Sequence, residues 1–331
     1  MKQKELWINQ IKGLCICLVV IYHSVITFYP HLTTFQHPLS EVLSKCWIYF
    51  NLYLAPFRMP VFFFISGYLI RRYIDSVPWG NCLDKRIWNI FWVLALWGVV
   101  QWLALSALNQ WLAPERDLSN ASNAAYADST GEFLHGMITA STSLWYLYAL
   151  IVYFVVCKIF SRLALPLFAL FVLMSVAVNF VPTPWWGMNS VIRNLLMASL
   201  LTVLAVGAWL FTISLLLSLV SIVVIMKLFY QYEQRFGMRS TSLLNVIGSN
   251  TIAIYTTHRI LVEIFSLTLL AQMNAARWSP QVELTLLLVY PFVSLFLCTV
   301  AGLLVRKLSQ RAFSDLLFSP PSLPAAVSYS R

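Results

Sequence analysis

Charged residues are scarce in this chain of 331 residues. Asp, Glu, Lys and Arg together make up 10% of it, whereas about a quarter is usual for a soluble domain. Hydrophobic residues make up 60%, and the mean hydropathy is +0.76. These values exclude a water-soluble fold. Apolar stretches of roughly 18 to 25 residues recur along the chain, each long enough to cross a bilayer as a helix, so we expect an all-α, polytopic membrane protein.

Closely spaced cysteines are also missing. The six cysteines are scattered and lack the paired spacing of a zinc site or a disulfide framework. We therefore expect no metal and no tightly bound cofactor. The net charge of +10 favours anionic partners, but the basic clusters alternate with apolar spans, as the bias of Lys and Arg toward cytoplasmic loops predicts. Membrane lipid is the expected surrounding, and nucleic acid is not an expected partner.

The amino terminus resembles a signal peptide but reads better as a retained helix. Residues 1–26 have a basic start and an apolar run, yet they lack a small-residue cleavage site. With this terminus cytoplasmic, the cytoplasmic segments hold 15 of the 22 Lys and Arg residues. The predicted location is the cytoplasmic (inner) membrane, with both termini cytoplasmic.

We predict about eight membrane-spanning helices, with a range of eight to ten. Their approximate bounds are 11–29, 47–70, 88–109, 144–160, 164–181, 191–226, 245–270 and 283–305. The sixth is too long for one upright helix and short for two. Splitting it would move Arg306, Lys307 and Arg311 outside, so the basic residues favour eight spans.

The spans form one predicted domain, residues 1–317. The proline-broken segment 318–331 is expected to be a disordered tail. The longest exterior loop, residues 110–143, either shapes the entry of a polar substrate or is a solvated connector, and the sequence leaves both open.

Inserting an ionisable side chain at the centre of a membrane helix costs about 2.5 to 3.5 kcal/mol on insertion scales, so such residues in the predicted spans often serve function. Lys12 and His23 lie on one face of the first helix, with His23 about 18 Å deeper. His23 could instead simply bond to a neighbouring helix. Arg58 and His258 each lie thirteen or so residues from a cytoplasmic border, at a similar depth. The three residues predict a polar cavity at mid-membrane.

Two further pairs occupy the seventh span. Tyr255 and His258 are neighbours on one helix face, and they could orient groups, bind an acceptor or only pack. Arg259 and Glu263 stand four residues apart and are expected to pair with each other.

Five ordered motifs carry a family resemblance over nearly the whole chain. They are Asn-x-x-Lys-Gly followed by His23, then FRMPVFFFISG, DKRIWNIF, LWYLYAL and IGSNTIAIYTTH. Together they resemble the integral membrane acyltransferase 3 family, and most closely its fucose 4-O-acetylase-like branch. The resemblance implies many helices and acyl transfer from a cytoplasmic acyl-CoA to a carbohydrate hydroxyl.

The chain departs from the family pattern at three points. Many members have Arg where this chain has Lys12, and an acidic residue at Asn9. The branch often has His where this chain has Arg58, which stays protonated and cannot act as a base. Relatives commonly have about ten helices, and residues 191–227 look short by a hairpin.

The resemblance and the chemistry together give a set of expected roles. His23 is the expected general base, with an acyl-histidine route also open, and Arg58 is expected to stabilise negative charge. The anionic donor, acetyl-CoA or another acyl-CoA, is expected to meet cations at the cytoplasmic mouth: Lys12, Arg71, Arg72, Lys85 and Arg86. The expected acceptor is a carbohydrate or lipid-linked glycan. A transporter or flippase, and a non-catalytic relative of the enzymes, are the alternatives.

Overall fold

The structure is a computed structural model that describes residues 6–75, 77–116, 118, 123–161, 164–199, 209–237, 239–275 and 278–321. Most of these residues are helical, and they contain no strand. The elements in chain order are α1 (Leu6–Phe28), η1 (Tyr29–His31), α2 (Pro38–Tyr53), α3 (Ala55–Asp75), α4 (Trp79–Cys82), η2 (Leu83–Trp88), α5 (Asn89–Leu112), η3 (Ala124–Tyr126), α6 (Thr130–Ile138), α7 (Trp145–Ile159), α8 (Ala164–Ala177), α9 (Trp186–Ser199), α10 (Trp209–Phe236), α11 (Leu243–Ser249), α12 (Thr251–Ala275) and α13 (Pro280–Ala312).

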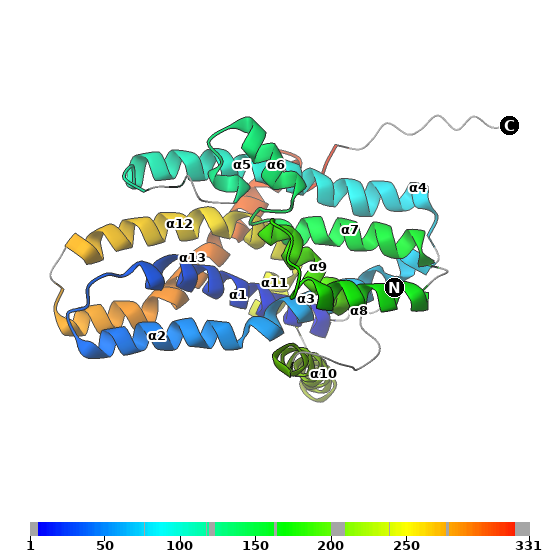
Figure 1. Cartoon of the computed structure of the whole chain (residues 1–331), viewed down its shortest axis with the longest axis horizontal. Coiled ribbons are helices and arrows are strands. Elements are labelled where there is room, and N and C mark those ends of the chain that lie inside the picture. The colour runs from blue at the N-terminus through cyan, green and yellow to red at the C-terminus, as the bar shows by residue number, and fades with distance from the viewer. Residues whose placement is uncertain are drawn as a thin grey trace.

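Helix α1 occupies the middle of the bundle, where it packs against α3, α11, α12 and α13 (Figure 1). Its residues are mainly apolar, and its buried side chains lie on every side of the helix, as expected of a helix enclosed by others. Helices α5, α7, α8 and α9 lie around this centre, and α6 with η3 forms a cap beside α5. The view of Figure 1 runs nearly along α10, whereas the other long helices lie across it.

The polarity pattern is that of a membrane protein, with polar groups inside and apolar groups outside. On α5, Gln101 is buried and donates a hydrogen bond to the Thr256 carbonyl at 2.8 Å, while Leu103 is 59% exposed. On α13, Ser294 is buried and Phe296 is 65% exposed. In water this arrangement would expose apolar surface, whereas in a bilayer it satisfies the polar groups internally.

Five helical stretches in the described residues are long and apolar enough to cross a membrane: Leu6–His31, Pro38–Ile70, Arg86–Leu112, Thr251–Met273 and Pro280–Ala312. They match five of the predicted spans, and they confirm the prediction of an all-α, polytopic membrane fold. Helix α7 is apolar but has only 15 residues. The count of eight stays a prediction.

The doubtful sixth span, 191–226, falls on two helices. Helix α9 ends at Ser199 and α10 begins at Trp209, and residues 200–208 lie outside the described part of the chain. Whether this region crosses the membrane once or twice therefore also stays a prediction.

The segment after α13 packs against the bundle farther than the sequence predicts. Phe318, the expected start of the tail, is 7% exposed and stacks on Trp97 with ring centroids 5.6 Å apart. Trp92 and Trp97 donate indole hydrogen bonds to the carbonyls of the two residues before it, at 2.7 and 2.9 Å. The tail boundary at Phe318 is therefore placed too early, and residues 322–331 lie outside the described residues.

Candidate functional site

Two glycines let α1 and α11 approach each other at backbone contact. A Cβ at Gly13 would collide with the Leu244 carbonyl, and one at Gly248 would collide with the Asn9 carbonyl. This contact aligns the start of α1 with α11. Since α12 follows α11 directly, its residues run alongside the second half of α1, which fixes the relative depth of the two helices.

The alignment brings His23 of α1 beside His258 of α12. Their ring centroids are 5.1 Å apart, with the planes tilted by 48°. His258 is 1% exposed, whereas His23 is half-buried. The shared depth predicted from the sequence is confirmed for this pair. His258 is thus the buried ring that can support its neighbour, and His23 is the ring that a substrate can reach.

Hydrogen bonds fix the tautomer of His258. Its Nδ1 lies 2.7 Å from the Tyr255 carbonyl and 3.2 Å from the Ile254 carbonyl. Because a carbonyl oxygen only accepts, Nδ1 carries the proton and Nε2 keeps a lone pair. Nε2 is buried with no hydrogen-bond partner among the described residues. An unpaired acceptor next to His23 is a group that can hold the His23 ring in one orientation.

Arg58 of α3 completes this group of residues. Its guanidinium lies 4.2 Å from the centroid of the Tyr22 ring, and Tyr22 in turn packs against His23 with ring centroids 5.0 Å apart. Its Nη1 donates to the carbonyl and side-chain oxygens of Asn51, at 3.0 and 3.1 Å. Arg58 is 5% exposed, so it does not snorkel to an interface. It braces the break between α2 and α3 and also brings a fixed positive charge near His23.

Tyr255 lies beside the histidines and also holds a buried polar segment in place. Its hydroxyl donates to the Ser143 carbonyl at 2.7 Å. The hydroxyls of Tyr146 and Ser66 lie 2.7 Å apart, which ties the LWYLYAL motif to the FISG motif. Thus the IGSNTIAIYTTH, LWYLYAL and FISG motifs meet beside the site. The polar residues just before α7 are buried inside the bundle.

Arg259 and Glu263 form the expected pair, at 3.1 Å, inside a larger network. Glu263 is 1% exposed and also accepts from Arg116 at 2.6 Å and from Tyr126 at 2.9 Å. Arg259 additionally bonds to the Tyr126 hydroxyl. Burial raises the pKa of Tyr126 to about 12, so this phenol stays protonated and serves as a donor. The sequence did not predict Arg116 or Tyr126, because they lie more than 130 residues away in the chain.

The cations expected to bind the donor are only partly described. Lys12 is half-buried and Arg86 lies 4.0 Å from the Tyr73 ring centroid. The side chains of Arg71, Arg72 and Lys85 lie outside the described part, so their role stays a prediction. Lys158, one of the 15 basic residues counted on the cytoplasmic side, is buried and donates to the carbonyls of Tyr73 at 2.7 Å, Ile74 at 3.2 Å and Val77 at 2.8 Å. It therefore caps the end of α3.

The fold and the site define a class of protein: a multi-pass helical membrane protein with ionisable groups collected inside the bundle. A family model described as the acyltransferase domain of the acyltransferase 3 family matches residues 5–212. This match covers more than half of the chain, so the chain belongs to that family. His23 and Arg58 lie inside the match, whereas His258 lies beyond it. The fucose 4-O-acetylase-like branch stays a prediction.

One relative agrees with the chain over its whole length. The inner membrane protein YcfT of Escherichia coli strain K12 is 92% identical over 357 residues, an alignment that covers all of both chains. The prediction of an inner-membrane, multi-pass protein is confirmed. No solved structure matches the chain.

The alignment is longer than this chain. It has 357 positions and the chain has 331 residues, so at least 26 positions carry no residue of this chain. These positions account for nearly all of those that are not identical.

Proposed function

We propose that the chain is a membrane-embedded O-acyltransferase that moves an acyl group, foremost acetyl, from cytoplasmic acyl-CoA to a hydroxyl of a cell-envelope carbohydrate or glycolipid. The observation that carries this proposal is the pair of histidines 5.1 Å apart inside the bundle. Family membership supports acyl transfer as the reaction class.

The proposed reaction uses His23 as the general base. Neutral His23 accepts the proton of the acceptor hydroxyl while the hydroxyl oxygen attacks the thioester carbonyl. The tetrahedral intermediate then expels the sulfur of CoA, and the protonated His23 returns its proton to that sulfur. One ester bond forms, one thioester bond breaks, and free CoA leaves with its thiol protonated.

His258 is proposed as a positioning residue. Its Nε2, which has no hydrogen-bond partner among the described residues, is the acceptor that one nitrogen of His23 meets when the His23 ring turns toward it, which leaves the other nitrogen free to take the acceptor proton. This role follows from the Nδ1 hydrogen bonds to the Tyr255 and Ile254 carbonyls, which force Nε2 to be the acceptor.

Arg58 supplies the positive charge for the intermediate. One of its nitrogens is held by Asn51, and the guanidinium is stacked on Tyr22, so its position is preorganised. Fixed charge of this kind stabilises a developing oxyanion more than a mobile charge does. At the cytoplasmic mouth, Lys12, Arg71, Arg72, Lys85 and Arg86 are proposed to attract the phosphates of CoA.

The reaction is tested with protein reconstituted in lipid nanodiscs, radiolabelled acetyl-CoA and an extract of cell-envelope glycolipids. We expect His23→Ala to lower the release of CoA by 10²- to 10⁴-fold, the usual contribution of a general base. The matched control is His31→Ala, because His31 lies at the end of η1 and is exposed, and this variant should retain full activity. Equal rates in both variants would contradict the base assignment.

A second candidate, a non-catalytic relative of the enzymes, is favoured by the 26 or more aligned positions at which this chain has no residue. Residues 191–227, which are short by a hairpin against the family pattern, favour the same candidate. In that case purified protein would release no CoA, whatever residue stands at position 23. Restoring the additional segment of the relative should then restore activity.

A further inference from the structure

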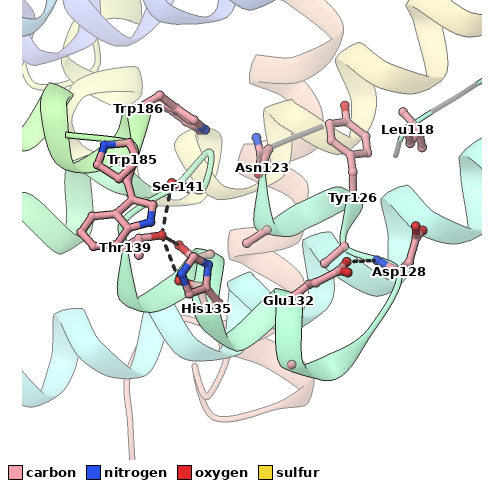
Figure 2. A pocket seen from close by; sticks show the side chains of 15 residues that line it. Leu118, Asn123, Tyr126, Asp128, Glu132, His135, Thr139, Ser141, Trp185 and Trp186 are labelled. Atoms are coloured by element: carbon pink, nitrogen blue, oxygen red, sulfur yellow. Dashed lines mark hydrogen bonds between the residues drawn. The ribbon is translucent and has the colours of Figure 1, made fainter. Parts of the chain in front are cut away.

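A cavity outside the histidine site lies between the α5–α7 connection and the start of α9 (Figure 2). Its volume is about 530 Å³, within the roughly 300 to 1,000 Å³ that is usual for ligand pockets. Figure 2 shows Trp185 and Trp186 on one side and Asp128 and Glu132 on the other. The cavity thus has one aromatic wall and one acidic wall.

The aromatic wall is held rigidly. The turn before α9 is closed by Asn189, whose side chain accepts from the Thr183 backbone N–H at 2.8 Å and hydroxyl at 2.7 Å. The Asn189 amide donates to the Thr183 carbonyl at 2.9 Å. These bonds fix the backbone that carries Trp185, which is 39% exposed. A preorganised aromatic face of this kind loses little entropy when it binds a ligand.

The segment beside the cavity, between the lining residues Thr139 and Ser141, is equally constrained. Ala140 adopts a φ of +56°, which is unfavourable for a residue with a Cβ, and it is fully buried. A Cβ at Gly187 would collide with the Ala140 carbonyl, so α9 packs directly on this segment. The backbone N–H of Ala124 also donates to the Ser141 carbonyl at 2.7 Å. Strain held in place by its surroundings is typical of binding sites.

The side chains define the chemistry of a ligand. Indole faces pack against the C–H face of a pyranose ring, and carboxylates accept hydrogen bonds from its hydroxyls. The described residues that line the cavity include two carboxylates, Asp128 and Glu132, and no Lys or Arg. This acidic balance favours neutral or amino sugars and disfavours sugars that carry a carboxylate or a phosphate.

The cavity adjoins the histidine site through two contacts. Tyr126 lines the cavity and donates to Glu263 of α12, five residues after His258. Ser141 lines it as well, and two residues later the Ser143 carbonyl accepts from Tyr255. A group bound in the cavity would therefore contact residues that are linked to α12, the helix that carries His258.

We propose that this cavity binds the acceptor carbohydrate, as a neutral or amino pyranose stacked on Trp185 and hydrogen-bonded by Asp128 and Glu132. This assignment rests on the proposed function for its role in catalysis. Sugar binding itself can be measured without turnover, so the two proposals can fail separately.

The test is saturation-transfer NMR on the protein in nanodiscs, with three probes: methyl glucoside, methyl glucosaminide and methyl glucuronide. We expect signals from the first two and at least fivefold less from the glucuronide. Trp185→Ala should lower the signals fivefold or more. The matched control Trp111→Ala should not change them, because Trp111 is 79% exposed and does not line the cavity.

A second pair of variants keeps the proposal testable if Trp185→Ala misfolds. Asp128→Asn with Glu132→Gln retains the shape but removes the charge, so the glucuronide signal should rise toward that of the glucoside. Equal signals in the Trp185 and Trp111 variants, or a preference for glucuronide in the unaltered protein, would overturn the proposal. Normal sugar binding by the unaltered protein, if that protein releases no CoA, would refute the proposed function and leave the carbohydrate site standing.

Discussion

Replacing Glu263 with glutamine should destabilise the protein strongly. The Glu263 carboxylate is 1% exposed and neutralises Arg259, which is 7% exposed, as well as Arg116. Glutamine keeps the volume of the side chain but removes the charge. Arg116 has a third of its side chain exposed and can turn toward water, so Arg259 alone is left as an uncompensated buried charge. Breaking a buried pair in this way typically costs about 3 to 5 kcal/mol, and we expect a value near the lower end.

The assay is reversible unfolding of the purified protein in mixed micelles with increasing SDS, followed by circular dichroism. In a double-mutant cycle, adding Arg259→Met to Glu263→Gln should recover about 2 kcal/mol of the loss, because the stranded charge is removed. Glu41→Gln is the matched control. Glu41 pairs with Lys45 at the surface, with both side chains more than half exposed, and its replacement should not change the stability measurably. The reasoning is refuted if Glu263→Gln behaves like Glu41→Gln, or if the two losses at positions 263 and 259 simply add.

Three further predictions follow from the packing and the polar contacts. Gly248→Ala should reduce the yield of folded, monodisperse protein severalfold, because its Cβ meets the Asn9 carbonyl. Gly80→Ala should have no effect, since nothing lies within 4 Å of a Cβ there. Fluorescence-detected gel filtration measures both yields. Lys158→Met should raise amide exchange at the end of α3 about tenfold or more by mass spectrometry, because three carbonyls lose their donor. The raised pKa of Tyr126, about 12 against 10.0 for an unperturbed tyrosine, contributes stability that is complete below about pH 10 and is lost as the pH rises to about 12; Tyr126→Phe should remove that slope from the pH dependence of unfolding.

Part of the fold and site could be predicted because membrane insertion imposes simple rules. Spans of apolar residues and the bias of basic residues gave five helices that the structure contains. Counting residues from a predicted membrane border placed His23 and His258 at one depth, and their rings are in contact. The spacing of Arg259 and Glu263 on a helix predicted their ion pair.

Other features could not be predicted because they depend on contacts between distant segments. Nothing in the spacing of Arg116 or Tyr126 marks them as partners of Glu263, since both come from the long exterior loop, for which the sequence leaves substrate entry and a solvated connector both open. The sequence also does not predict the cavity wall at Trp185, because this wall exists only where α9 packs on Ala140. The packing of Phe318 on Trp97 was missed because a proline-rich composition around it resembles disorder.

The central claim is that His23 drives O-acylation of an envelope carbohydrate. The most direct test is mass spectrometry of cell-envelope glycans from a strain that lacks the gene and carries either the unaltered protein, His23→Ala or His31→Ala, each confirmed in the membrane fraction. The account predicts glycans with an added acyl mass in the strains that carry the unaltered protein or His31→Ala, and none in the strain that carries His23→Ala. If the group transferred is acetyl, the added mass is about 42 Da, the mass of C₂H₂O. An acyl mass that persists with His23→Ala would contradict it.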